Sequence, residues 1–350
     1  MNNWKQHLVP DSFTIREAMV RLNELAIVNA DIFVVDGSGE LLGSLSDGDI
    51  RRALIKGAEM QDAATVAMNP ACIAHTGAWP SKEAVQNCKK KAIRFLPLLS
   101  ADRRIVQVID IDLVLGAVPV HAVLMAGGEG QRLRPLTEKL PKPLLPIGNK
   151  PIIEHNIDRL LKFGIQNIHI SINYLGHMLQ DYFADGAAKN ADINYIREDK
   201  PLGTVGAVAQ VKLWSADHIL VMNSDLLTDI DYADFFDTYI SGDADMAIAT
   251  VPYKVNVPYA VLETNGDSEV KSLTEKPTYT YYSNAGIYLV KRELLQFIPE
   301  DCCYNMTDLI DTLIAKGYKV VSYPIHGYWL DIGKMNDYVK AQEDVKYLKL

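Results

Sequence analysis

The sequence predicts a layered α/β domain preceded by a smaller, internally duplicated segment, and three observations support this prediction. Of the 350 residues, 48% are hydrophobic and 23% charged, a composition too apolar for a disordered chain. From His121 onward, apolar strand-like runs alternate with amphipathic helices, which is typical of an α/β domain with a largely parallel sheet. Before that point, one order of strands and helices occurs twice. We therefore expect two domains, of residues 1–118 and 119–350.

The duplicated segment repeats its strand, turn, strand and helix order after about sixty residues. In the first copy, strands are expected at residues 32–35 and 41–45, with a helix from Asp49; in the second, at 95–99 and 105–109, with a helix from Asp112. A helical stretch precedes each pair of strands, at residues 15–25 and 81–91. Repeats of this length usually bury a shared core, so we expect the two copies to pack together.

The second domain begins with a buried-strand run at residues 122–126 that enters a glycine-rich loop. A helix is expected from near Pro151 to Gly164, because its apolar residues share one face. Further strands are expected at residues 168–172, 218–222 and 245–251, and a terminal helix at 335–348. His169, inside the first of these strands, is expected to be a surface or satisfied histidine and not a ligand.

Charge and cysteine content exclude several classes of protein. The formal net charge of −9 disfavours a nucleic acid or an anionic membrane as partner. No apolar run approaches the ~20 residues of a membrane-spanning helix, and the first ten residues do not resemble a signal peptide. The cysteines lack metal-ligand spacing and indicate reduced thiols and a cytoplasmic location: Cys72, Cys88, Cys302 and Cys303.

Residues 121–150 differ from this acidic average. They hold five cationic residues against two carboxylates: Arg132, Arg134, Lys139, Lys142 and Lys150 against Glu129 and Glu138. A local surplus of positive charge indicates a site for a small anionic ligand, and a solvated basic face is the alternative.

The loop after the first strand of this domain contains Gly127, Gly128 and Gly130. Glycines let the backbone approach a ligand closely and direct N–H groups toward phosphate oxygens. The loop is not a dinucleotide-binding motif, because Leu133 stands where its third glycine would be. It is not a P-loop either, because no Gly-Lys-Ser/Thr triplet follows.

Two cations near this loop are candidates for phosphate chemistry. Arg132 follows the glycines, and Lys142 lies between Pro141 and Pro143, whose rings stiffen the segment. Charge that spreads over a transferring phosphate is stabilised by cations held in place, which makes Arg132 and Lys142 candidate catalytic residues.

Residues 127–137, followed by 141–144, resemble the signature of sugar-1-phosphate nucleotidyltransferases. The resemblance spans residues 121–350 and implies a Rossmann-like α/β/α fold with a mixed, mostly parallel sheet. Further motifs of the family follow in its order: Pro201-Leu202-Gly203-Thr204, Asn223-Ser224-Asp225, Glu275-Lys276-Pro277, Asn284-Ala285-Gly286-Ile287-Tyr288 and Trp329-Leu330-Asp331-Ile332-Gly333.

The resemblance implies a role for each motif. Asp225 and Asp331 would bind Mg²⁺, which accepts one or two carboxylates together with phosphates and water. Taken alone, Asp225 is equally typical of a helix cap or turn, Glu275-Lys276 of a solvated turn, and Thr204 of an N-cap. The remaining implied roles are nucleotide binding by Gly127, Gly128, Gly130 and Gly203, and sugar-phosphate binding by Glu275, Lys276 and Asn284.

Two positions depart from the family pattern. Ser224 stands where glycine is common, and Ala260 stands in a Tyr259-Ala260-Val261 element where glycine often brings backbone to the sugar. The methyl group of Ala260 crowds that approach, so the choice of sugar is not carried over. Neither change removes a cation or a metal ligand.

Residues 1–118 resemble a tandem pair of cystathionine-β-synthase-type (CBS) domains. Such pairs often bind adenine nucleotides through a Ser/Thr-x-x-Asp element, which the first copy retains as Ser46 and Asp49. The second copy has Ile109 at the hydroxyl position and keeps Asp112. The resemblance implies a nucleotide effector at the first copy and a homo-oligomer through the pair; a pair that serves only dimer packing is the alternative.

The predicted reaction joins an NTP and a sugar 1-phosphate into an NDP-sugar and pyrophosphate, with Mg²⁺ as cofactor. The Pro-Lys-Pro-Leu motif and the CBS pair most resemble guanylyltransferases that act on mannose-, heptose- or glucosamine-type 1-phosphates. We therefore favour GTP and glucosamine 1-phosphate, as in bacterial nonulosonic acid pathways. Cytidylyl, uridylyl or thymidylyl transfer and a catalytically silent nucleotide-sugar sensor are the alternatives.

Overall fold

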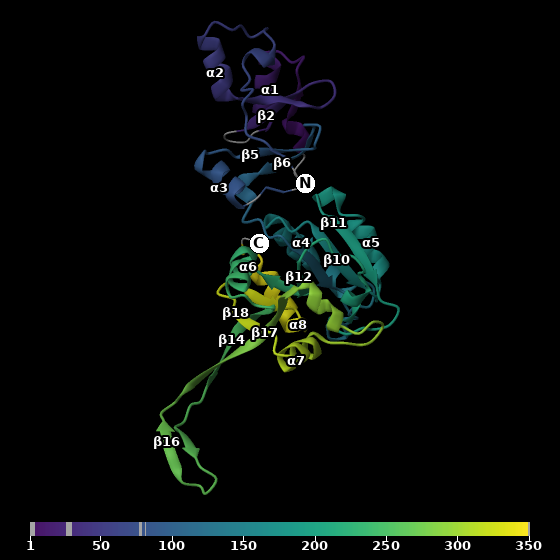
Figure 1. Cartoon of the computed structure of the whole chain (residues 1–350), viewed down its shortest axis with the longest axis vertical. Helices are drawn as coiled ribbons and strands as arrows, with labels where there is room; N and C mark the ends of the chain where they lie inside the picture. The colour runs from purple at the N-terminus through teal and green to yellow at the C-terminus, as the bar shows by residue number, and fades with distance from the viewer. Residues whose placement is uncertain (1–3, 26–29, 77–78, 81, 349–350) are drawn as a thin grey trace. The chain divides into compact units, whose positions relative to one another are not determined.

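The computed structural model describes residues 4–25, 30–76, 79–80 and 82–348 (Figure 1). The chain divides into two compact units, one of residues 1–117 with 162–164 and one of residues 118–161 with 165–350. Among the described residues, no helix has the length and apolar character needed to cross a membrane.

The first unit contains two sheets of the same design among its described residues. In each, the first strand pairs parallel with the second, and the second pairs antiparallel with the third. A helix joins the first two strands of each sheet. The elements are β1 (Leu8–Pro10), α1 (Ile15–Leu25), β2 (Asp31–Val35), β3 (Leu41–Ser46) and α2 (Asp47–Ile55), then β4 (His75–Thr76), α3 (Lys82–Lys90), β5 (Phe95–Leu99) and β6 (Ile105–Asp110).

The two sheets share a hydrophobic core, in agreement with the predicted duplication. Phe33 and Leu41 from the first copy cluster with Phe95, Leu99 and Ile105 from the second. Ser81, the first residue of one predicted helix, lies outside the described residues.

The helix predicted from Asp112 is wrong. The structure has the short 3₁₀ helix η3 (Ile111–Leu113), after which Val114 has extended backbone. Leu113 and Leu115 are exposed whereas Val114 is buried. This alternation has the two-residue period of extended chain and not the period of a helix, which explains why the helix ends at once.

The second unit is built on a seven-stranded sheet in the described chain. Its order is β11-β10-β7-β12-β17-β14-β18, and of these strands β17 alone runs antiparallel to its neighbours. The sheet is therefore mixed and mostly parallel. Its strands are β7 (His121–Met125), β10 (Asn167–Ile172), β11 (Asp192–Arg197), β12 (His218–Asn223), β14 (Met246–Asn256), β17 (Thr278–Lys291) and β18 (Val320–Pro324).

Helices cover both faces of this sheet. On one face, Met306 and Leu309 of α7 pack with Ile219 and Val221 of β12. On the other, Tyr232 of α6 contacts the Met222 sulfur, and neighbouring residues of a strand point to opposite faces. The helices are α4 (Ile152–Lys162), α5 (Gly176–Phe183), α6 (Tyr232–Ser241), α7 (Met306–Ala315) and α8 (Met335–Asp344), with 3₁₀ helices η4 (Gln131–Leu133), η5 (Lys142–Leu144), η6 (Ala187–Lys189), η7 (Gly206–Gln210) and η8 (Arg292–Phe297).

The predicted helix near Pro151 and the predicted strands are present, and most of their ends shift by a residue or two. The strand predicted at 245–251 continues five residues farther, to Asn256. The terminal helix stops at Asp344, earlier than expected. Short strand pairs complete the unit: β8 (Pro146–Ile147) with β9 (Lys150–Pro151), β13 (Leu226–Thr228) with β19 (Trp329–Asp331), and β15 (Val261–Thr264) with β16 (Val270–Thr274).

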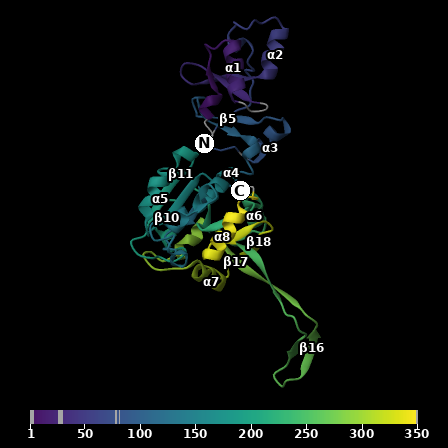
Figure 2. The ribbon, with the colours of Figure 1, turned by 180° about the vertical axis from the view of Figure 1, so that it is seen from behind.

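A long hairpin extends from one edge of this unit. Strands β14 and β17 remain paired beyond the sheet, as far as Asn256 and Thr278, and β15 and β16 form the end of the hairpin. Both views show this hairpin projecting away from the body of the unit (Figures 1 and 2). We refer to residues 252–283 as the arm.

Candidate active site

The glycine loop follows β7 and packs against the side chain of Lys142. Gly130 has a φ of +62°, and a Cβ there would lie 2.9 Å from the Lys142 Cβ. Thr137, which is buried, donates its hydroxyl to the Gly130 carbonyl at 2.9 Å. Because both the positive φ and the close approach exclude a side chain, glycine is required at this position.

The turn that carries Asp225 is held to the same edge of the sheet by buried polar groups. The Ser224 N–H and hydroxyl both donate to the Met125 carbonyl at the end of β7, at 3.2 and 2.7 Å. The Asn156 side chain of α4 donates to the carbonyls of Ser224 and Leu226, at 3.3 and 2.9 Å. These contacts fix Asp225 at the carboxyl ends of β7 and β12, where open α/β sheets bind ligands.

Lys142 and Asp225 form an ion pair at this edge. The Lys142 ammonium donates to Asp225 Oδ2, and the two side chains are 11% and 23% exposed. Pro141 and Pro143 flank the lysine, so its backbone has little freedom. The pair thus holds one ammonium group in place beside the glycine loop.

Asp331 lies next to this pair. Strand β19 places Asp331 opposite Leu226, and the Ile332 N–H donates to the Asp225 carbonyl at 3.1 Å. Although Asp331 is solvent-accessible, its pKa is raised, first because neighbouring atoms partly desolvate it and then because the Asp225 carboxylate repels its charge. The positive charges of Lys142 and Arg132 oppose this rise.

Arg132 reaches the same point from the glycine loop. A Cβ built on Gly333 would lie 3.5 Å from Asp331 Oδ2 and 3.8 Å from Arg132 Nη1. The structure therefore brings together four residues that are far apart in sequence: Arg132, Lys142, Asp225 and Asp331.

These residues fit a divalent cation. Asp225 Oδ1 is buried and has no hydrogen-bond partner in the described part of the chain, although Oδ2 is paired with Lys142. A second carboxylate, Asp331, lies beside it. No group of three or more His, Cys, Asp or Glu residues suited to a metal occurs among the described residues. Two carboxylates nevertheless suffice for Mg²⁺, which usually keeps waters and binds substrate phosphates.

Sequence reasoning missed a buried carboxylate on the other side of the loop. Glu198 follows β11, and its Oε2 accepts the Leu202 N–H at 3.0 Å. A Cβ built on Gly127 would lie 2.7 Å from Glu198 Oε1, so the glycine makes room for this side chain. The signal was an acidic residue three positions before the Pro-Leu-Gly-Thr motif. Asn156 had no comparable signal.

Gly203 and Thr204 contact the N-terminus of α7. Gly203 has a φ of +78°, and a Cβ there would lie 2.6 Å from the Tyr304 carbonyl oxygen. The Thr204 hydroxyl accepts the Met306 N–H at 2.8 Å. Thr204 therefore satisfies an N–H at the start of a helix distant in sequence, and not one in the helical turn that follows it.

The structure does not bring the predicted sugar-binding residues together. Asn284 lies at the base of the arm, where its Oδ1 accepts the Gly286 N–H at 2.9 Å. Glu275 and Lys276 lie in the arm, between β16 and β17, and are exposed. Ala260 also lies in the arm and is exposed.

Ser46 and Asp49 of the first unit form the capping box of α2. The Ser46 hydroxyl donates to Asp49 Oδ2 at 2.6 Å, and the Asp49 N–H donates back to the hydroxyl at 3.3 Å. Arg52 pairs with the other carboxylate oxygen. Both predicted ligand residues thus have a structural role that accounts for their presence.

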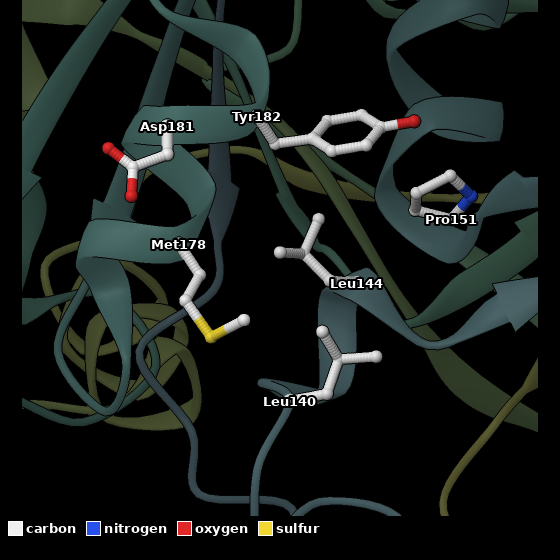
Figure 3. A pocket seen from close by; sticks show the side chains of 6 residues that line it. All are labelled: Leu140, Leu144, Pro151, Met178, Asp181 and Tyr182. Atoms are coloured by element: carbon white, nitrogen blue, oxygen red, sulfur yellow. The ribbon is translucent and has the colours of Figure 1, made fainter.

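A pocket of about 350 Å³ lies beside the segment that carries Lys142 (Figure 3). Leu140, Leu144 and Pro151 form one side of it, and Met178, Asp181 and Tyr182 of α5 form the other. Because this lining is mostly apolar, the pocket does not suit a phosphate group.

The fold and this site define an α/β protein in which two carboxylates and two cations meet at the carboxyl ends of the strands. Residues 121–347 match the model of the nucleotidyl transferase family, and the chain belongs to this family. Its fold is the Rossmann-like α/β fold of the nucleotidyltransferases, as expected from the sequence. The match leaves residues 1–120 outside it.

Individual relatives agree with this assignment. The chain is 32% identical over 232 residues to a mannose-1-phosphate guanylyltransferase of Mycobacterium tuberculosis, covering 65% of this chain and 64% of that protein. It is 30% identical to a D-glycero-alpha-D-manno-heptose 1-phosphate guanylyltransferase of Aneurinibacillus thermoaerophilus, covering 65% of this chain and 99% of that protein. A crystal structure of HddC from Yersinia pseudotuberculosis with GMP-PN is 28% identical, with a TM-score of 0.51 over 65% of this chain and 99% of that one.

Proposed function

We propose that the chain transfers a nucleotidyl group from an NTP to a sugar 1-phosphate. A phosphate oxygen of the sugar 1-phosphate attacks the α-phosphorus of the NTP and forms a new P–O bond. The bond from the α-phosphorus to the bridging oxygen breaks, and pyrophosphate leaves with that electron pair. No protein group becomes covalently attached, so catalysis rests on positioning and electrostatics.

In this proposal the glycine loop holds the triphosphate. Gly128 is exposed and leaves open space, so phosphate oxygens can approach its backbone N–H. Lys142 and Arg132 stabilise the negative charge that develops on the α-phosphate and on the leaving pyrophosphate. Because Lys142 is held by Asp225, its ammonium needs little rearrangement when substrate binds.

Asp225 and Asp331 would hold Mg²⁺, which when bound would neutralise part of the negative charge of the substrate phosphates. Buried Asp225 Oδ1 is the ligand atom that the fold leaves unpaired among the described residues. This atom, together with the nearby Asp331 carboxylate, is the observation that carries the proposal. Glu275, Lys276 and Asn284 would bind the sugar phosphate, and Gly203 the nucleobase.

GTP is the proposed nucleotide. The Mycobacterium and Aneurinibacillus relatives are guanylyltransferases by name, and the HddC structure was obtained with GMP-PN. Guanine presents adjacent N–H donors, and an ionised carboxylate, which only accepts hydrogen bonds, is a complementary partner for them. Glu198, buried beside Gly127, supplies such an acceptor. Glucosamine 1-phosphate is the favoured acceptor, with mannose- and heptose-type 1-phosphates next.

The experiment is an assay of purified protein with Mg²⁺, each of four NTPs and a panel of sugar 1-phosphates. Products are followed by pyrophosphate release and mass spectrometry. We expect one productive pair that contains GTP. Turnover with CTP, UTP or dTTP alone would replace the guanylyl assignment. Tight nucleotide binding without pyrophosphate release across the panel would favour a nucleotide-sugar sensor.

We also propose that residues 1–118 are a tandem CBS pair that supports a homo-oligomer and binds a nucleotide effector. The two sheets of equal design around one core support the pair. Because Ser46 and Asp49 already cap α2, an effector has to share these groups with the helix. The test is a thermal shift with adenine and guanine nucleotides for the wild type and Asp49→Asn, in which Asn retains a capping oxygen. If a nucleotide raises the Tm of the wild type but not of the variant, the result supports the effector site. If no nucleotide changes the Tm of the wild type, the pair serves dimer packing only.

A further inference from the structure

The proposed function needs the metal- and phosphate-binding residues and the sugar-phosphate-binding residues in one site, but the structure places these two groups far apart. Asp225, Asp331, Lys142 and Arg132 lie at the body of the second unit, whereas Lys276 lies in the arm with Glu275. From Asn284, at the base of the arm, the strand advances eight residues to reach Lys276. At about 3.3 Å per residue, this places Lys276 roughly 26 Å farther out.

The hairpin pairing opposes a return of the arm to its own body. The β14–β17 ladder continues without interruption from Thr250 opposite Asn284 to Asn256 opposite Thr278. To bring Lys276 to Asp225 of the same chain, this ladder would have to break and the strands double back. Both views show the arm directed away from the body (Figures 1 and 2).

The arm exposes large apolar side chains of the kind that protein interfaces bury. None of residues 251–284, all of which the structure describes, is buried. Tyr259 is 76% exposed and Tyr282 60%, and other large apolar residues are exposed with them: Tyr253, Leu262, Val270, Leu273 and Tyr281. A two-stranded hairpin is marginally stable alone in water, and exposed apolar surface rich in tyrosine is typical of protein contacts.

Polar contacts likewise join the arm only to itself. Among the described residues, every side-chain hydrogen bond of residues 252–283 is made inside the arm, as between Ser272 and Glu263 or Thr278 and Asn256. Lys276 has a φ of +43°, which is unfavourable for a residue with a side chain, and it precedes Pro277. Backbone strain of this kind is concentrated at functional positions.

We propose that two copies of this chain exchange their arms, so that the partner subunit's Glu275 and the partner subunit's Lys276 complete the site at Asp225 and Asp331. This inference rests on the proposed function. A second copy is the occupant because its body carries a site that lacks the residues the arm bears. Reciprocal exchange also closes after two subunits and leaves no arm unpaired. The register shift between Ile248 and Thr250 supplies a bend where the arm leaves the sheet.

The first test detects which chain the arm contacts and does not depend on catalytic activity. Tyr279, an exposed residue of the arm, is replaced by the photoreactive p-benzoylphenylalanine in the full-length chain, and Tyr347, exposed on the body, is replaced likewise as the matched control. After irradiation, we expect the arm variant to form two-chain adducts in which the arm peptide joins residues 127–142 or 331–335. The control should form no such adduct.

Four outcomes of this test overturn the exchange. A single-chain adduct between arm and site means that the arm returns to its own body. A two-chain adduct of arm with arm means a different dimer, and an adduct with another class of protein, or none, means that the arm does not reach a second copy.

The second test is complementation between two inactive variants. Lys276→Ala and Asp225→Asn chains with different tags are co-expressed, and mixed dimers are purified through both tags. Exchange places one intact body with one intact arm, so the mixed dimer regains about half of the wild-type rate. Without exchange, each site keeps one defect and the mixed dimer stays as inactive as its parents.

The two tests also separate failure of the inference from failure of the function. An inactive wild type that still forms arm-to-site adducts contradicts the proposed function alone. An active wild type whose mixed dimers are inactive, or a Lys276→Ala homodimer with the wild-type rate, overturns the exchange. Circular dichroism and Tm confirm that each variant is folded.

Discussion

Lys142 and Asp225, which are 83 residues apart in sequence, form an ion pair largely withdrawn from solvent at the carboxyl ends of β7 and β12. The pair uses one oxygen of the carboxylate and leaves the other buried and unpaired within the described chain. In the proposed function, the Asp225 side chain thus holds the Lys142 ammonium in place for phosphate and offers its other oxygen to a metal. The site is arranged before any substrate arrives.

Asp225→Asn should lower kcat by about 100-fold or more, because the amide cannot supply a negatively charged metal ligand. The fold should persist, since asparagine has nearly the same shape and its oxygen can still accept from Lys142. Steady-state rates across a Mg²⁺ titration measure this effect. Asp311→Asn, an exposed aspartate on α7, is the matched control and should keep the wild-type rate. Equal rates in both variants would contradict the metal assignment.

Gly130→Ala should destabilise the protein by about 1–3 kcal/mol, because alanine at a φ of +62° is strained and its methyl group meets Lys142. The rate should fall as well, since the displaced group is the Lys142 stem. Gly128→Ala is the control for stability, because a methyl group there contacts nothing within 4 Å. Denaturant unfolding of the two variants should separate them. A Gly130→Ala protein as stable as the wild type would show that the loop adapts.

Glu198→Gln should reduce the preference for GTP over the other NTPs by about 10-fold to 100-fold, which is the discrimination expected of a paired hydrogen bond to a base edge. Glutamine can still accept the Leu202 N–H through its oxygen, so the local fold should remain. Ratios of kcat/KM for the four NTPs provide the measurement. An unchanged ratio would remove Glu198 from base recognition.

The protein should lose stability as the pH falls from about 6.5 toward 4, in part through His169. Burial, with the nearby His121 adding to it, lowers the pKa of His169 from 6.5 to about 4. The centroid of its ring lies 4.9 Å from the ring centroid of Trp214. In this interval the unfolded chain binds a proton that the folded chain does not, so acid favours unfolding. We expect His169 to lower the free energy of unfolding by about 1–2 kcal/mol at pH 5 relative to neutral pH.

His169→Gln should therefore show a smaller decrease in Tm between pH 7.5 and pH 5 than the wild type. His177→Gln, which changes an exposed histidine of α5, is the control and should follow the wild type. If the Tm of all three proteins decreases by the same amount between pH 7.5 and pH 5, His169 does not contribute to the acid sensitivity.

Sequence reasoning predicted the helices and strands whose local periodicity is clearest, and it did not predict β11, β17 or the helices α5, α6 and α7. It failed at Asp112, where the repeated order of elements suggested a helix, whereas the alternating burial of Leu113, Val114 and Leu115 indicates extended chain. It singled out Lys142 and Asp225 through motifs. It missed Asn156, because the side chain that braces the Asp225 turn comes from a helix whose relation to that turn depends on packing alone.

The arm shows the same division on a larger scale. The sequence indicated a turn at Glu275-Lys276 and a family motif there, and both interpretations concern a few neighbouring residues. That these residues lie on an extended hairpin depends on the β14–β17 register, which joins residues up to 44 positions apart, as Met246 with Val290. Such register is set by long-range pairing.

By itself, the sequence determined which chemical groups the protein contains, where the helices and strands with the clearest periodicity lie, and the family to which the chain belongs. The tertiary structure alone decided which of those groups meet: Asp331 with Asp225 through β13 and β19, Arg132 with Asp331, and Glu198 with Gly127, while Lys276 stays apart. The physical reason is range. Backbone preference and apolar periodicity act over a few residues, whereas strand order and side-chain burial depend on the whole folded chain.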